Sequence, residues 1–81
     1  MRFFANDIQD KYVMSSDGIY LGQVNNLVVD TKSGKVLHLL VLPSEEVDIR
    51  KYKLDSQQRL VLPFKKVKSI KDVVIMSPLF D

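Results

Sequence analysis

The chain has 81 residues and a formal net charge of +2, with 46% hydrophobic and 27% charged residues. This length suits one domain with one core, and the mixture of apolar and charged residues excludes intrinsic disorder. The absence of cysteine excludes disulfides, thiolate metal sites and thiol nucleophiles. Sixteen Val and Ile residues against one Ala favour strands, because β-branched side chains suit a pleated sheet. We therefore expect a single all-β domain over residues 1–81.

Two hairpins are predicted in the first half of the chain. The pair Asp17-Gly18 lies between two apolar stretches and is typical of a type I′ turn, which requires positive φ. The following strand, residues 20–30, loses its alternation at Asn25-Asn26, where one extra residue would form a β-bulge and bend the strand. Residues 30–35 form the next loop, with Gly34 expected in the left-handed position that ends it.

The middle of the chain predicts a central strand and a third hairpin. Residues 36–43 are apolar on both faces, so this strand is expected to be covered on both sides. Residues 44–47 are a polar connection that could hold one helical turn. Residues 49–54 are then expected to pair with residues 60–62 across a four-residue loop.

The last part of the chain predicts a short helical turn and a final strand. Pro63 occupies a helix-start position, and a helical or 3₁₀ turn at Phe64–Val67 would plug an open end of the sheet. Residues 73–76 form the last strand, which Pro78 ends because proline cannot donate to a ladder. Residues 77–81 are expected to be a short tail.

Several short motifs occur in a characteristic order. The most telling are the Gly-(x)₃-Gly-x-Val stretch at Gly18, Gly22 and Val24, the loop from Asp30 to Gly34, and Leu62-Pro63-Phe64. Together with 8–13 and 72–75 they cover nearly the whole chain, which resembles the PRC-barrel family. The nearest likeness is to the stand-alone archaeal PRC-barrel proteins.

The resemblance implies a small, strongly bent antiparallel β-barrel of about six strands that acts as a binding module. Such domains occur in the cytoplasmic subunit of photosynthetic reaction centres and in a ribosome-maturation factor, and neither role is enzymatic. Stand-alone archaeal members are similar to homodimeric adaptors of the cell-division machinery, which bind the membrane anchor of the tubulin-like division ring. Many members carry Gly where Lys71 stands, so that turn is either built differently here or mildly strained.

We find no catalytic, cofactor or metal site in the sequence. His38 is the only histidine and is interpreted as a core or interface residue. Glu45, Glu46 and Asp48 lack the alternating pattern of a calcium loop and are interpreted as a solvated loop. The run Ser33-Gly34-Lys35 lacks the other residues of a phosphate-binding loop. The leading hypothesis is therefore a non-enzymatic adaptor.

The adaptor hypothesis places the chain in the cytoplasm, because no apolar run is long enough for a membrane span or a signal peptide. Its barrel is expected to present exposed strand edges and apolar ends to another protein, such as a cell-division component, and to form a homodimer. Aromatic and Arg side chains usually anchor such contacts. The candidate partner-binding residues are Phe3, Phe4, Arg50, Tyr52 and Phe80.

An alternative function follows from charge. Residues 50–71 carry eight basic residues against Asp55 alone. Such a segment could bind the phosphates of RNA in a ribosome-assembly role, attract anionic lipid, or discourage aggregation at a sheet edge. The residues of this candidate basic patch are Arg50, Lys51, Lys53, Arg59, Lys65, Lys66, Lys68 and Lys71.

Overall fold

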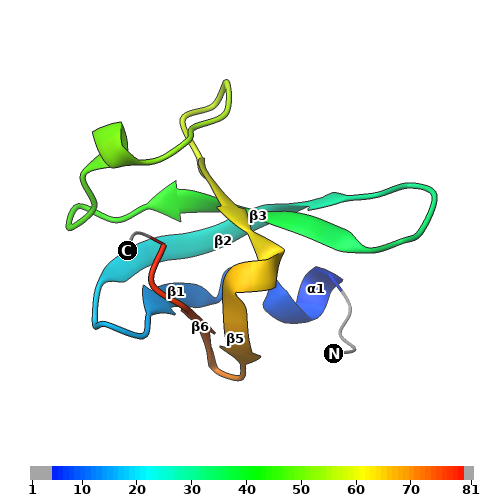
Figure 1. Ribbon diagram of the computed structural model, residues 1–81, viewed down its shortest axis with the longest axis horizontal. Helices are drawn as coiled ribbons and strands as arrows, with labels where there is room; N and C mark the ends of the chain where they lie inside the picture. Colours follow the sequence, from blue (N-terminus) through cyan, green and yellow to red (C-terminus); the bar gives the residue numbers. More distant parts are fainter. Residues whose placement is uncertain (1–4, 80–81) are drawn as a thin grey trace.

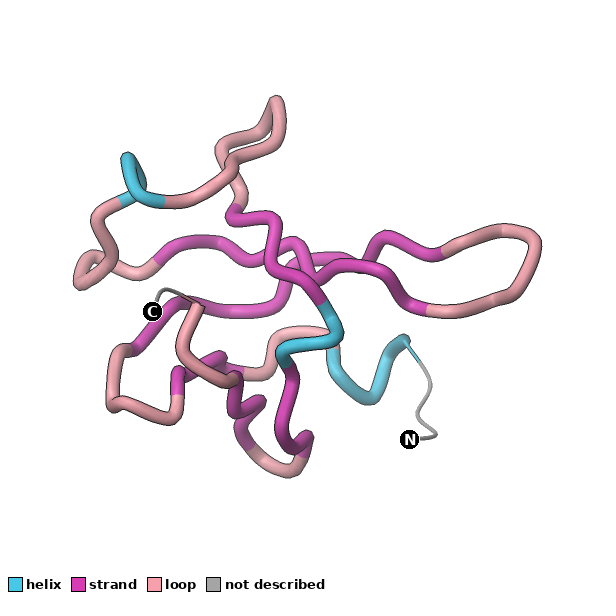
Figure 2. Tube along the Cα trace, in the orientation of Figure 1, coloured by secondary structure: helices cyan, strands magenta, loops and turns pink. Residues whose placement is uncertain are grey.

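The computed structural model describes residues 5–79 (Figures 1 and 2). Three short helical elements are present in this part of the chain: α1 (Ala5–Ile8) and the 3₁₀ helices η1 (Ile49–Lys51) and η2 (Phe64–Lys66). The strands are β1 (Tyr12–Ser15), β2 (Tyr20–Val29), β3 (Val36–Pro43), β4 (Leu60–Pro63), β5 (Val67–Ile70) and β6 (Val73–Met76).

The six strands form one sheet in the order β4-β3-β2-β1-β6-β5. All neighbours are antiparallel except β1 and β6, which are parallel. The predicted all-β, strongly bent six-stranded fold is confirmed, but the purely antiparallel arrangement is corrected by this one pair. The sheet is also not closed, because its edge strands β4 and β5 are joined only by η2 (Figure 1).

The predicted β-bulge in β2 is confirmed. Val24 pairs with Val41 and Asn26 pairs with Leu40, so Asn25 is the extra residue. The irregularity lets Val24 and Leu27, three positions apart, both contact the core. Similar register shifts occur between β1 and β2 and between β5 and β6, which explains how so short a sheet bends so strongly.

The first turn differs from the predicted type I′ geometry. The Gly18 N–H donates to the Ser15 carbonyl at 3.0 Å, and Gly18 has φ +94°, whereas Asp17 is not among the described non-glycine residues with positive φ. This is a type I turn followed by a left-handed glycine. The reason lies in Ser15, whose hydroxyl donates to the Asp17 carboxylate and accepts from the Ile19 N–H at 3.2 Å.

The second loop has the predicted form. The Gly34 N–H donates to the Asp30 carbonyl at 2.8 Å, and Gly34 has φ +74°. The Asp30 carboxylate accepts the Lys32 N–H at 2.9 Å. The Lys32 N–H bond is the largest cause of a lowered pKa of Asp30, and hydrogen bonds from Ser33 add to it. The loop lies at the end of the β2–β3 hairpin, which projects from the sheet (Figure 1).

The third predicted hairpin is largely wrong. Ile49–Lys51 forms η1 because the Asp48 carboxylate caps it, accepting the Arg50 N–H at 3.1 Å. Pairing with β4 is reduced to a bridge between Leu54 and Leu60 and a 2.9 Å hydrogen bond from the Val61 N–H to the Lys53 carbonyl. A local capping interaction thus overrides the apolar alternation.

The core lies on the inner face of the bent sheet. Phe64 and Val67 pack against it from the predicted turn after Pro63, which is confirmed as η2. The fully buried side chains come from α1 and from every strand except β5: Ile8, Val13, Leu21, Val24, Leu39, Val41, Leu60, Leu62, Val74 and Met76.

The predicted two-sided covering of β3 holds only for its middle. Leu39, Leu40 and Val41 are buried, whereas Leu37 and Leu42 are each 46% exposed. β3 does lie between β2 and β4, but β4 pairs only with His38 to Val41, so both ends of β3 extend past β4.

The backbone conformation at Gly22 and at Lys71 shows which of these two positions requires glycine. Gly22 has φ +150°, and a Cβ there would lie 1.9 Å from the Leu42 carbonyl oxygen, so β2 and β3 approach each other too closely for a side chain. Lys71 is not among the described residues with positive φ. The turn before Asp72 is therefore built differently from a glycine turn, and Lys71 is not strained.

Candidate protein-binding surfaces

The strands are almost free of charge. Among all residues of the six described strands, Lys68 is the only Asp, Glu, Lys or Arg. The charges lie instead in the turns and the 3₁₀ segments. An antiparallel sheet with one face in water normally alternates apolar and polar residues. Here neither face of β1, β2, β3, β4 or β6 has an Asp, Glu, Lys or Arg side chain from its own strand.

The register defines the side chains on the outer face of β6, β1, β2 and β3. Tyr12 lies between Val73 and Gln23, and Gln23 in turn faces Leu42. In the next row Met14 lies between Tyr20 and Ile75. Their neighbours along the strands are buried, so alternation directs this set away from the core. We call it the outer apolar face: Tyr12, Met14, Tyr20, Gln23, Leu42, Val73 and Ile75.

Two members of the outer apolar face are strongly exposed. Tyr12 is 54% exposed and Leu42 is 46% exposed. The Tyr12 and Tyr20 rings contact each other edge to face, with centroids 5.8 Å apart. Such a contact orders both rings and gives the surface a rigid aromatic feature. Large, rigid and uncharged surfaces of this kind are typical of contacts with another protein.

A polar contact lies next to the outer apolar face and uses a predicted basic-patch residue. The Arg59 Nε donates to the Asp55 carboxylate at 2.7 Å, and its Nη1 donates to the Asn25 Oδ1 at 2.8 Å. The Arg59 side chain is only 13% exposed. Arg59 therefore fastens the 55–58 loop to the β2 bulge, and we leave it out of the surfaces described below.

The hydrogen bonds from Arg59 also lower the pKa of Asp55. Hydrogen bonds from the Arg59 N–H, from the Arg59 side chain and from the Gln57 N–H hold the pKa of Asp55 below its ordinary value of 3.8, the first of them having the largest effect. The carboxylate form is the one that accepts these hydrogen bonds. Asp55 is thus kept charged by the loop that it organises.

The predicted partner-binding residues are not brought together in the described structure. Phe3, Phe4 and Phe80 lie outside the described residues. Arg50 is exposed and pairs with Asp48 at 3.0 Å, which lowers the pKa of Asp48 and raises that of Arg50. Tyr52 is half-buried and packs against the core. Of this set, Tyr52 belongs to a surface hollow.

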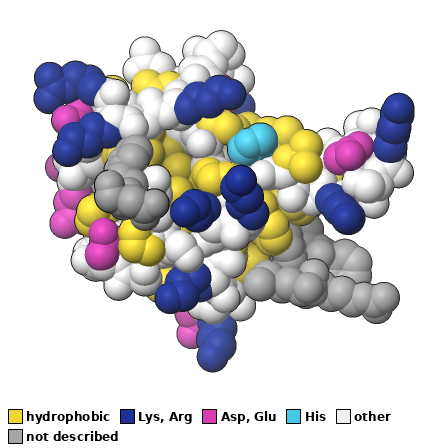
Figure 3. Space-filling view, viewed as in Figure 1, with side chains coloured by type: hydrophobic (Ala, Val, Ile, Leu, Met, Phe, Trp, Pro, Cys, Tyr) yellow, Lys and Arg dark blue, Asp and Glu magenta, His cyan; other side chains and the backbone are white. Residues whose placement is uncertain are grey.

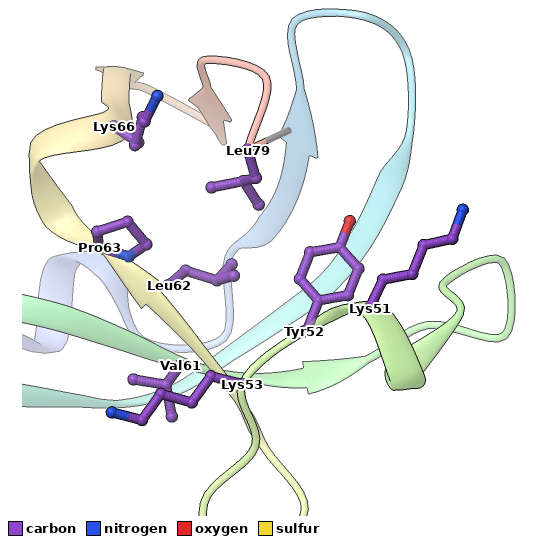
Figure 4. A pocket seen from close by; sticks show the side chains of 8 residues that line it. All are labelled: Lys51, Tyr52, Lys53, Val61, Leu62, Pro63, Lys66 and Leu79. Carbon is purple, nitrogen blue, oxygen red and sulfur yellow. The ribbon is translucent and has the colours of Figure 1, made fainter. Parts of the chain in front are cut away.

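The hollow has a volume of about 160 Å³ and lies beside the free edge of β4 (Figure 4). The Tyr52 ring stands opposite Leu62 and Leu79, and Lys51 and Lys66 extend outward around them (Figure 4). We call the whole set the β4 hollow. Its lining residues are Lys51, Tyr52, Lys53, Val61, Leu62, Pro63, Lys66 and Leu79.

Burial raises the pKa of the Tyr52 hydroxyl, and the negative charge of Asp17 adds to this effect. The Tyr52 side chain packs against the core, and its ring lines the β4 hollow (Figure 4). The lining residues that belong to neither predicted set are Val61, Leu62, Pro63 and Leu79. No local pattern could indicate them, because they come together only when β4 passes residues 51–53.

The sequence predicts that strand edges are presented to a partner. The edge of β4 that does not pair with β3, however, offers few free N–H groups. The Val61 N–H is already bonded to the Lys53 carbonyl, and Pro63 has no N–H to offer. These are common ways of preventing edge-to-edge pairing. Recognition at this edge must therefore use side chains.

The remaining basic residues are spread over more than one surface. Lys65, Lys68 and Lys71 are exposed on η2, on β5 and in the turn before β6. Figure 3 shows Lys and Arg side chains separated by hydrophobic ones on this face, without one continuous basic stripe. Of the predicted basic patch, the β4 hollow gathers only Lys51, Lys53 and Lys66.

The other polar candidates lie apart from one another. His38 is half-buried on β3, between Val28 and Pro63 on the adjacent strands. Glu45 and Glu46 are exposed in the connection after β3. Within residues 5–79 no three His, Cys, Asp or Glu side chains are grouped closely enough to hold a metal ion. Nor does this part of the chain contain a helix of the length and apolarity needed to span a membrane.

These features define a small β-domain with one strongly bent six-stranded sheet and a side-chain hollow beside β4. The PRC-barrel domain model matches residues 1–81, and the chain belongs to the PRC-barrel family. It is also similar to an uncharacterized protein of the archaeon Methanocaldococcus jannaschii, with 30% identity over 67 residues. That match covers 83% of this chain and 72% of the relative.

Proposed function

We propose that this chain is a non-enzymatic, protein-binding adaptor that associates with another protein chain through its outer apolar face. The observation that carries the proposal is the near absence of charge from the strands, on the face that does not form the core. A solvated sheet face gains nothing from Tyr, Met, Leu, Val and Ile, whereas a face that is covered by a partner gains about 25 cal/mol for each Å² of apolar area removed from water.

A second copy of the chain is the partner that we propose for this face. Dimers with twofold symmetry use the same patch on both subunits, which requires a patch without strong charge of one sign. The outer apolar face meets that requirement. The resemblance to stand-alone archaeal PRC-barrel proteins supports a cytoplasmic role as a cell-division adaptor, in which the homodimer would leave its remaining surfaces for other proteins.

Analytical ultracentrifugation at tens of micromolar tests the dimer. We expect the wild-type chain to sediment as a dimer and Leu42→Lys to sediment as a monomer, because a charge would be buried without a partner. Leu37→Lys is the matched control, since Leu37 is the same residue type on the same strand with the same 46% exposure, but lies outside the outer apolar face. It should leave the dimer intact.

A monomeric wild-type chain would contradict the dimer, and equal effects of the two lysine variants would contradict this choice of face. Binding of RNA that weakens steeply with rising salt would favour the phosphate-binding alternative, because counterion release then supplies the affinity. A nuclease-treated pulldown that retains protein partners would support the adaptor.

A further inference from the structure

We infer that the β4 hollow binds a peptide segment of another protein in which one aromatic or large aliphatic side chain is flanked by Asp or Glu. This inference rests on the proposed function, because it names the chemistry of a partner for the adaptor. It concerns a surface that lies apart from the outer apolar face. The two surfaces can therefore be tested independently.

The size and lining of the β4 hollow select one apolar side chain. Its volume is about 160 Å³. A cavity of about 150 Å³ holds a benzene ring. The Tyr52 ring, Leu62 and Leu79 converge on the space, so that an inserted ring would meet apolar atoms on several sides (Figure 4). Aromatic side chains in such pockets contribute much of the energy of peptide binding.

The charges around the β4 hollow select acidic neighbours. Three of its lining residues are lysines, and none is acidic. Within the described chain, Lys53 and Lys66 make no ion pair, and Lys51 acts on Asp48 only as a minor contributor to its lowered pKa. Carboxylates on either side of the inserted ring would meet ammonium groups without displacing an existing partner. A basic peptide would be repelled by all three lysines.

The blocked edge of β4 excludes recognition by an added strand. Pro63 offers no N–H, and the Val61 N–H is bonded to Lys53. Specificity must then come from the inserted side chain and from the charges around it. Nucleic acid is disfavoured, because the three lysines surround an apolar hollow instead of following one continuous groove.

Selection from a random heptapeptide phage library on the immobilised full chain tests the inference. We expect the enriched peptides to share an aromatic or large aliphatic residue with Asp or Glu within two positions of it. The most enriched peptide, labelled with fluorescein, is then titrated by fluorescence anisotropy. Lys53→Glu and Lys66→Glu should each weaken its binding about fivefold, which is the scale of one exposed charge pair.

Lys35→Glu is the matched control, because Lys35 is an exposed lysine in the loop that projects beyond the sheet (Figure 1). It should not change the affinity. Enrichment of no sequence, of sequences without acidic residues, or equal weakening by all three variants would overturn the inference. So would equally tight binding of a poly-uridine oligonucleotide. The dimer formed through Leu42 is measured separately, so its presence or absence does not decide this result.

Discussion

The two faces of the sheet are both apolar, but their side chains differ in burial. The inner face buries side chains such as Leu39 and Val41 completely, whereas the outer apolar face leaves Tyr12 and Leu42 about half exposed. The same residue types therefore stabilise the fold on one side and remain available for contact on the other. The comparison teaches that composition alone does not separate core from interface in so small a domain, because only the register assigns each residue to a face.

The largest expected effect compares the two faces of one strand, β3. Leu39→Ala should lower the free energy of unfolding by about 3 to 4 kcal/mol, because it leaves a cavity in the core. Leu42→Ala should lower it by only about 0.5 kcal/mol in the monomer, because its side chain is partly in water. Urea denaturation followed by circular dichroism measures both. Similar losses would show that the outer face is part of the core.

The next effect concerns the close approach of β2 and β3. Gly22→Ala should cost about 3 kcal/mol, since the new Cβ would overlap the Leu42 carbonyl and the backbone would be strained. Gly18→Ala should cost about 1 kcal/mol, because Gly18 also has positive φ but its Cβ would meet open space. Thermal unfolding of both variants checks the difference. If Gly22→Ala were as mild as Gly18→Ala, β2 and β3 could separate without loss.

The smallest effect concerns pH. The folded-state pKa of Asp55 is lowered below 3.8, so its contribution to stability is complete above that ordinary value and is lost as the pH falls through the lower folded-state value. Asp55→Asn should therefore reduce the loss of stability between neutral pH and pH values below 3.8. Glu45→Gln removes an exposed carboxylate after β3. This variant should lose more stability over the same pH range than Asp55→Asn does. Urea midpoints at both pH values provide the measurement, and identical profiles would contradict the role of Asp55.

Local signals in the sequence predicted much of the fold. Gly34 needs its left-handed position and Asn25 interrupts the alternation of β2, and the structure has both features where the pattern places them. The signal for the outer apolar face is also in the sequence, because almost all charges lie outside the strands. It becomes readable only when strand bounds and register are known.

The missed features depend on short segments or on distant contacts. The helix α1 (ANDI) and the strand β5 (VKSI) each have two polar residues at their centre, so neither shows the apolar run that marked the equally short β4 and β6. The parallel pairing of β1 with β6 joins segments about sixty residues apart along the chain. The Asp48 cap stabilises η1 at the position where apolar alternation predicted a strand. The β4 hollow forms because residues 51–53, at the end of η1 and after it, pass beside β4.

The parallel pair also has a consequence for how the chain is made. A ribosome releases Tyr12–Ser15 long before Val73–Met76, so one side of β1 must wait unpaired until the last strand emerges. The hairpin of β2 and β3, which needs only a short loop, can form during that wait. Pairing of β1 with β6 is thus a late step in completing the sheet, because it joins two segments about sixty residues apart along the chain.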